Sequence, residues 1–227
     1  MPIQPRTPTP TAAVEDYAKA IYALSRDGRA PVTTNALAAR LGVTPASASA
    51  MVKRLDEMGL ARHAPYHGVE LTDRGSQLAL EILRHHRLLE LYLAESLGVP
   101  WDRVHDEAEV LEHVLSEELE ELIARKLGDP TRDPHGDPIP TRDLVIVEDP
   151  ADTLESLEPG VCGHFIRISD SDPDMLRYLA ERGIAPGAEF EVVDKQPFGG
   201  PSFVRFSGEV HVFGGELASR MRVEVTL

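Results

Sequence analysis

The chain has 227 residues, of which 42% are apolar, 27% charged and 5% aromatic, and its formal net charge is −15. It has no run approaching the roughly 18 apolar residues of a membrane-spanning helix, and its N-terminus lacks the apolar segment of a signal peptide, so we expect a cytoplasmic protein without a membrane partner. A single cysteine, Cys162, excludes an intramolecular disulfide framework and any thiolate-rich zinc or iron–sulfur site.

Helical periodicity and turn residues predict the elements of the first hundred residues. The proline-rich residues 1–12 are expected to form a disordered arm. Three helices are predicted next, over residues 13–25, 35–41 and 45–58. Thr44 can cap the third of these, with Pro45 at its favoured first position. Two short strand-like runs in residues 60–71 then predict a hairpin, and a long helix follows from Thr72 to about Leu97.

The second half of the chain changes character at a proline-rich segment. Residues 101–127 continue as helix, in two segments divided near Ser116. Residues 128–143 contain four prolines and two glycines, which is typical of a linker. Short strands are expected beyond it, over residues 163–168, 189–193, 202–206, 209–212 and 222–225, with one helix over residues 173–182. A small β-barrel is the natural closure for such strands.

Charge is divided unevenly between the two halves. Residues 1–75 have nine Lys/Arg and seven Asp/Glu, a sum of +2, whereas residues 76–227 have fourteen and thirty-one, a sum of −17. Residues 1–75 could therefore contact phosphates, and residues 76–227 could hold cations.

A helix, a glycine-containing turn, a second helix and a hairpin predict a winged helix-turn-helix, although a plain three-helix packing unit has the same pattern. The expected DNA contacts are Arg40, Thr44, Pro45, Ala46, Ser47, Ser49, Lys53, Arg54 and Arg62.

A possible metal site follows from spacing along the later helices. His105, Glu109, Glu112 and His113 lie at i, i+4, i+7 and i+8, so they share one helix face. The preceding helix offers a second pair at i, i+4, His86 and Glu90. Spacing alone does not distinguish these ligands from an ordinary solvated charged face.

The order of these segments resembles the DtxR/MntR family of metal-dependent repressors. The resemblance rests on VEDYAKAIYAL, HHRLLELYL, VHDEAEVLEHVLSEEL and DPHGDPIP, and on GIAPGAEFEVVD near the C-terminus. It implies an α+β protein with an arm (residues 1–12), a winged helix-turn-helix domain (13–75), a helical dimerisation and metal-binding domain (76–128), a proline-rich linker (129–152) and an SH3-like (FeoA-like) domain (153–227).

The resemblance also implies two metal sites per chain. The family's regulatory site falls on Asp16, Glu109, Glu112 and His113, and its ancillary site on His86, Glu90 and His105. The SH3-like domain is expected to add Asp170 or Asp172, with Asp174 as a further choice; for each, a helix-capping role is the alternative. Iron-type members offer Met and Cys where this chain has Asp16 and Glu109, and hard carboxylate ligands suit Mn²⁺. We therefore expect Mn²⁺, with Fe²⁺ as the alternative. One manganese subtype of the family has a second acid where this chain has Lys19. Because Lys19 cannot bind a cation, the resemblance favours two separated sites over one binuclear site.

These features predict a metal-activated repressor that binds palindromic operator DNA as a homodimer and controls metal-uptake genes. Part of the apolar stripe formed by Leu88, Leu91, Leu111, Val114, Leu115, Leu119 and Leu122 is expected to form the dimer interface.

A metal-independent winged-helix regulator and a metalloenzyme are the rival classes. The chain has no HExxH motif, nucleophile triad or phosphate loop, so we expect no enzyme and no small-molecule substrate. Other residues are expected to be structural: His135 as a linker residue, His164 and His211 on strand surfaces, Cys162 in the barrel core, and Gly214 and Gly215 in a turn.

Overall fold

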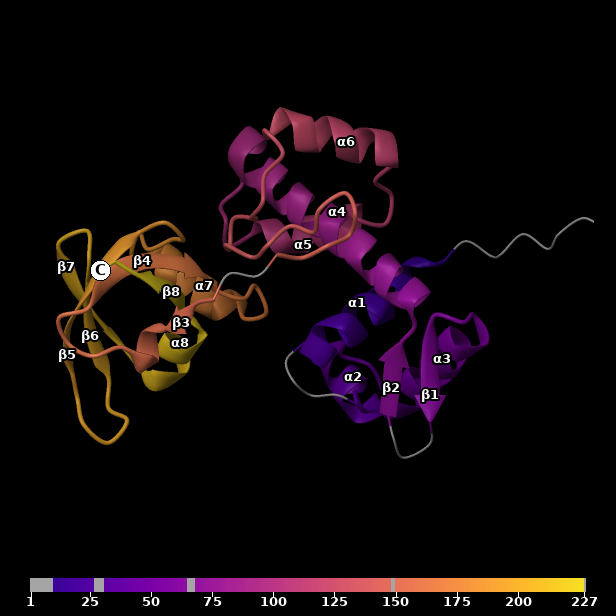
Figure 1. Ribbon diagram of the computed structural model, residues 1–227, viewed down its shortest axis with the longest axis horizontal. Coiled ribbons are helices and arrows are strands. Elements are labelled where there is room, and N and C mark those ends of the chain that lie inside the picture. The colour runs from indigo at the N-terminus through magenta and orange to yellow at the C-terminus, as the bar shows by residue number, and fades with distance from the viewer. Residues whose placement is uncertain (1–9, 27–30, 65–67, 148–149, 227) are drawn as a thin grey trace, which may run out of the picture. The chain divides into compact units, whose positions relative to one another are not determined.

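Figure 1 shows the computed structural model, which describes residues 10–26, 31–64, 68–147 and 150–226. The chain forms two units, one made of the residues up to His85 with Arg142–Val145, the other of His86–Thr141 with the residues from Ile146 onward. None of the helices in the described part is long and apolar enough to cross a membrane.

The first unit is a winged helix-turn-helix. Its elements are α1 (Ala12–Arg26), α2 (Thr34–Arg40), α3 (Pro45–Glu57), the hairpin β1 (Ala61–Ala64) and β2 (Gly68–Leu71), and the start of α4 (Asp73–Leu97). The predicted cap of α3 is present: the Thr44 hydroxyl oxygen accepts the backbone N–H of Ser47. The predicted hairpin turn, residues 65–67, lies outside the described residues.

The core of this unit fixes which face of α3 is free. Ala48, Val52 and Leu55 are fully buried against α1, α2 and the hairpin. The opposite face of α3 is therefore turned to solvent along its whole length. Gly75, in the first turn of α4, allows the helix to approach the hairpin, because a Cβ there would lie 1.9 Å from the Leu60 carbonyl oxygen.

The second unit begins with the rest of α4 and two shorter helices, α5 (Val104–Leu111) and α6 (Glu117–Lys126). The predicted break near Ser116 is the N-cap of α6, where the Ser116 hydroxyl oxygen accepts the Leu119 N–H. Buried side chains from all three helices and from the following loop form one cluster: Leu88, Leu89, Leu91, Ala108, Ile123, Ala124 and Ile139. Figure 1 shows α5 and the loop after α6 lying against α4.

An SH3-like domain completes the second unit. Its elements are β3 (Asp152–Thr153), the 3-10 turn η1 (Leu154–Ser156), β4 (Cys162–Arg167), α7 (Pro173–Ala180), β5 (Glu189–Lys195), β6 (Ser202–Phe206), β7 (Glu209–Phe213), α8 (Gly215–Arg220) and β8 (Arg222–Val225). The strands pair in the order β3-β8-β4-β5-β6-β7, all antiparallel. Among the described strands the ladder does not close, so the expected barrel is an SH3-like open sheet.

Two details of this domain differ from the sequence predictions. Gly214 and Gly215 do not form a turn between strands but start α8, with Gly214 at the N-cap. Cys162 is exposed rather than buried in the core, because it begins β4 on the outward-facing side of the strand. The core is instead aromatic and aliphatic, with Phe165, Phe206 and Phe213 almost fully buried.

Candidate metal centre

Four side chains from three segments of the second unit converge on one point. His86 and Glu90 lie one turn apart on α4, His105 lies on α5, and Asp170 follows β4 in the SH3-like domain. The His86 Nε2 atom is 3.0 Å from Glu90 Oε1 and 3.2 Å from His105 Nδ1. Asp170 Oδ2 lies 3.1 Å from His105 Nδ1 and 3.8 Å from His86 Nε2. We call these residues the four-residue cluster.

The spacing of the four-residue cluster fits a divalent cation. Ligand atoms bound to one ion at about 2.0–2.2 Å lie roughly 3–3.5 Å from one another, which is close to the separations given above. Two imidazole nitrogens and two carboxylate oxygens form a donor set suited to Mn²⁺, Fe²⁺ or Zn²⁺. His86 and Glu90 are almost completely buried, with exposures of 3% and 0%, so water does not satisfy these groups.

The shifted pKa values of the buried imidazoles and of Glu90 show that these groups interact strongly. Burial alone would lower the pKa of the His105 imidazole, but its contacts with Asp170 and Glu90 raise that pKa to about 10. The pKa of His86 is likewise raised, against burial, by Glu90, Asp170 and Glu112. Burial opposes ionisation of Glu90, yet His86, His105 and His135 hold its pKa below the usual range. Positive charge at the imidazoles therefore balances the carboxylates in the absence of a cation.

A second group, not foreseen from the sequence, adjoins the first through Glu90. His135 is fully buried, and its Nδ1 atom lies 3.6 Å from Glu90 Oε2 and 4.0 Å from Asp133 Oδ1. Among the described residues, neither Glu90 Oε2 nor His135 Nδ1 has a hydrogen-bond partner. The His135 Nε2–H donates to the Trp101 carbonyl oxygen at 2.8 Å, which leaves Nδ1 to face the carboxylate. We expected His135 to be an ordinary linker residue, and this expectation missed its contact with Glu90. The histidine between two aspartates in DPHGD is the sequence feature that could have indicated a metal-ligand residue.

Part of the predicted regulatory set surrounds the other nitrogen of His86. The His86 Nδ1 atom is 2.6 Å from Glu112 Oε2 and 3.9 Å from Glu109 Oε1. Glu112 is fully buried, and its Oε1 atom lies 3.5 Å from His113 Nε2. His86 is thus in contact with members of both predicted sites. Asp16 lies on α1 in the first unit, so its approach to Glu112 and His113 stays a prediction.

Comparison with known proteins identifies the chain. Residues 10–69 match a profile described as the iron dependent repressor N-terminal DNA binding domain, residues 72–141 its metal binding and dimerisation domain, and residues 153–225 the FeoA domain. The iron-dependent repressor IdeR of Mycobacterium tuberculosis is 33% identical over 222 residues, which cover 92% of this chain and 96% of IdeR. The chain is a member of the DtxR/MntR family. It is accordingly a metal-dependent transcriptional repressor, in a family of regulators rather than enzymes.

Relatives of this DtxR/MntR protein are named for both metals. The diphtheria toxin repressor of Corynebacterium diphtheriae is 31% identical, covering 92% of this chain and 96% of that protein. A solved structure described as a manganese-dependent transcriptional repressor in complex with manganese is 42% identical, has a TM-score of 0.85, and covers 94% of this chain and 100% of the other. The manganese regulator SloR is 30% identical with a TM-score of 0.77, covering 96% and 100%. Relatives named for iron and relatives named for manganese thus both match this chain over nearly its whole length.

The remaining predicted site residues lie outside the carboxylate–imidazole groups described above. Asp172 is the N-cap of α7, and its Oδ1 atom accepts the N–H groups of Asp174 and Met175. Among the described residues, Asp172 and Asp174 join none of the carboxylate–imidazole groups. All nine predicted DNA contacts are exposed on the first unit: Arg40, Thr44, Pro45, Ala46, Ser47, Ser49, Lys53, Arg54 and Arg62.

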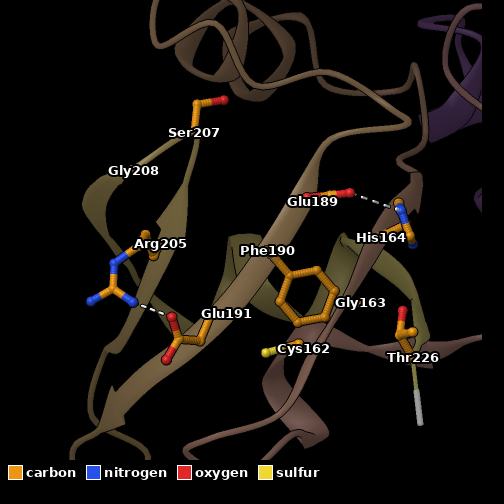
Figure 2. A pocket seen from close by; sticks show the side chains of 10 residues that line it. All are labelled: Cys162, Gly163, His164, Glu189, Phe190, Glu191, Arg205, Ser207, Gly208 and Thr226. Carbon is orange, nitrogen blue, oxygen red and sulfur yellow. Dashed lines mark hydrogen bonds and ion pairs between the residues drawn. The ribbon is translucent and has the colours of Figure 1, made fainter.

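A shallow pocket on the SH3-like domain of this DtxR/MntR protein is a separate feature (Figure 2). Cys162 and His164 lie on β4, opposite Glu191 and Glu189 of β5, and Arg205 follows on β6. Each acid already has a partner within the pocket: Glu189 lies 3.8 Å from His164, and Glu191 pairs with Arg205. Within the described part of the chain the pocket forms no metal-ligand group.

Proposed function

We propose that this repressor is activated by Mn²⁺ and binds palindromic operator DNA as a homodimer to control metal-uptake genes. The observation that carries the proposal is the four-residue cluster, whose nitrogen and oxygen atoms lie at coordination spacing without any sulfur donor. Its carboxylates favour a hard cation over softer metals. The manganese-dependent relatives named above support the same choice, and an iron-activated repressor of identical architecture is the alternative.

Two sets of ligands are assigned by this proposal. The ancillary site comprises His86, Glu90, His105 and Asp170, with His135 facing the free oxygen of Glu90. The regulatory site comprises Glu109, Glu112 and His113 of the second unit and Asp16 of the first. When bound, the metal supplies positive charge that carboxylates from both units can share.

The regulatory site takes its ligands from both units, and this explains how a metal could control DNA affinity. Asp16, Glu109 and Glu112 repel one another when they approach without a cation, which disfavours any orientation of the DNA-binding domain that brings them together. A ligand that binds one orientation better shifts the population toward it. We propose that the favoured orientation is the one in which two domains of a dimer match successive major grooves.

The DNA-binding surface is the exposed face of α3 with its flanks. The small side chains of Thr44, Ala46, Ser47 and Ser49 allow α3 to approach base edges closely, and Thr44 and Ser47 are already hydrogen-bonded to each other at 2.9 Å. Lys53 and Arg54 are placed to neutralise phosphates. With no Asn or Gln near the start of α3, we expect shape readout and thymine methyl contacts to provide much of the specificity.

The metal preference is tested by DNA binding of metal-stripped protein to a palindromic uptake-promoter fragment. Mn²⁺ and anaerobic Fe²⁺ are titrated separately at fixed salt. We expect activation at micromolar Mn²⁺ and markedly weaker activation by Fe²⁺, because the regulatory set has the carboxylates of Asp16 and Glu109 where iron-type members of the family offer Met and Cys. Equal activation by the two ions would contradict Mn²⁺ selectivity while leaving the metal-dependent repressor intact.

A pH dependence follows from the raised imidazole pKa values. His105, with a pKa of about 10, and His135, with a pKa of about 9, carry protons at pH 7. A cation that binds His105 must displace its proton, so Mn²⁺ affinity of the ancillary site should rise with pH by about tenfold per unit for each proton lost. Isothermal titration in buffers of different ionisation enthalpy, between pH 6.5 and 8.0, measures the protons released. A His105→Gln variant should release fewer; proton release of zero in the parent protein would contradict the assignment.

A further inference from the structure

The segment Asp133–Asp137, with the sequence DPHGD, forms a turn that is closed on itself. The Asp133 Oδ1 atom accepts the N–H groups of His135 at 2.8 Å and Asp137 at 2.9 Å. The Asp133 N–H in turn donates to the Asp137 carbonyl oxygen at 3.0 Å. The proposed function uses only the His135 ring of this turn and assigns no role to Asp133 or Asp137.

Arg87 joins this turn to α4, directly after the candidate ligand His86. Its Nη1 donates to the Pro138 carbonyl oxygen at 2.5 Å. Its Nε lies 3.6 Å from Asp133 Oδ2, and its Nη2 lies 3.8 Å from Asp137 Oδ1. The Arg87 side chain is only 15% exposed, so these interactions are weakly screened. One planar guanidinium thus bridges both carboxylates and the end of the turn, which a lysine cannot do.

The opposite side of the turn is held by the SH3-like domain. Gly136 has φ +84°, and a Cβ there would lie 1.9 Å from the Ile166 carbonyl oxygen of β4. The Ile168 N–H donates to the His135 carbonyl oxygen at 3.0 Å. Arg167 adds a second cation, with its Nη1 atom 3.7 Å from Asp137 Oδ1. The turn is therefore fixed between α4 and the strand that leads to Asp170.

We infer that Arg87 is a positioning residue for the ancillary metal site: it ties the Asp133–Asp137 turn to α4 and so holds the His135 ring against Glu90. The inference rests on the proposed function, because it assigns Arg87 a role toward that site. Without Arg87 the carboxylates of Asp133 and Asp137 lose the cation between them, and the turn that presents His135 loses its attachment to the helix of His86 and Glu90. A ligand shell that must first be ordered binds its metal more weakly.

The test measures Mn²⁺ binding to the metal-stripped full chain, using the electron paramagnetic resonance signal of free aqueous Mn²⁺. The variants are Arg87→Gln and Arg87→Lys, with Arg220→Gln as the control, because Arg220 makes a similar ion pair with Glu216 at an exposed position. Replacing the outer partner of a metal ligand commonly weakens binding by about 10–100-fold. We expect a loss of that size at one site per chain in Arg87→Gln, partial recovery in Arg87→Lys, and parent affinity in Arg220→Gln.

A structural role and a positioning role are separated by measuring thermal unfolding in parallel. If Arg87 only supports the fold, the metal-free melting temperature falls while Mn²⁺ affinity at both sites stays unchanged, and the inference is overturned. If Arg87→Gln does not fold, Asp137→Asn replaces it: this variant removes one carboxylate held by Arg87 and touches no assigned ligand. Unchanged affinity there also overturns the inference. Absence of Mn²⁺ binding to the parent protein would instead refute the proposed function.

Discussion

Replacing Glu112 with Gln is expected to abolish most of the metal-induced gain in DNA affinity. Glu112 is fully buried, with Oε2 2.6 Å from His86 Nδ1 and Oε1 3.5 Å from His113 Nε2. The glutamine amide keeps the shape but removes the negative charge and one ligand oxygen. Coupling between an effector site and a second site typically amounts to about 5–150-fold in affinity, and we expect the variant to lose most of that factor.

The measurement is the ratio of operator affinities with and without saturating Mn²⁺ at fixed salt. Glu121→Gln is the matched control, because Glu121 is half exposed on α6 and pairs only with its neighbour Arg125 among the interactions described. The control should keep the parent ratio. A full metal response in Glu112→Gln would show that Glu112 is no regulatory ligand and would contradict the assigned regulatory site.

Val114→Glu is expected to separate the homodimer into folded monomers. Val114 is 77% exposed and Val110 is 70% exposed, although both are large apolar residues of the metal-binding domain, Val110 on α5 and Val114 just after it. Leu111, Leu119 and Leu122 are also exposed, which makes a contiguous interface the simplest explanation. A buried carboxylate at that interface would be unpaired and strongly unfavourable.

Because Val114 is exposed within one chain, its replacement should leave the stability of the monomer within about 0.5 kcal/mol. Loss of the second half-site contact should weaken operator binding by about 10²–10⁴-fold. Sedimentation equilibrium gives the mass, and fluorescence anisotropy gives the DNA affinity. Val147→Glu, at a position 64% exposed outside these helices, is the control. A Val114→Glu protein that remains dimeric would place the interface elsewhere.

Sequence patterns were sufficient for the helical part of the fold because the signals there are local. Thr44 and Ser116 cap the helices that follow them, and the apolar period of α3 places Val52 and Leu55 in the core. Element boundaries in the SH3-like domain depend on pairing between distant strands. The short β3 therefore has no local signal, and the glycine pair at the start of α8 has the pattern of a turn.

The candidate site was predictable to the extent that its ligands lie on helices. His86 and Glu90, at i and i+4, face the same way whatever the tertiary structure. His135 approaches Glu90 only because the linker folds back over α4, and no pattern within the linker encodes that path. From the sequence alone, Asp170 and Asp172 are equally good candidates for a metal ligand. In the structure, Asp170 contacts His105, whereas Asp172 caps α7.

The central claim is that a divalent cation increases the affinity of this protein for its operator. The most direct test compares metal-stripped and Mn²⁺-saturated protein on one palindromic promoter fragment, at one ionic strength, with a chelator added back at the end. The account predicts weak binding without metal, an increase of about 5–150-fold with Mn²⁺, and reversal by the chelator. Equal affinity in the stripped and loaded states would contradict it.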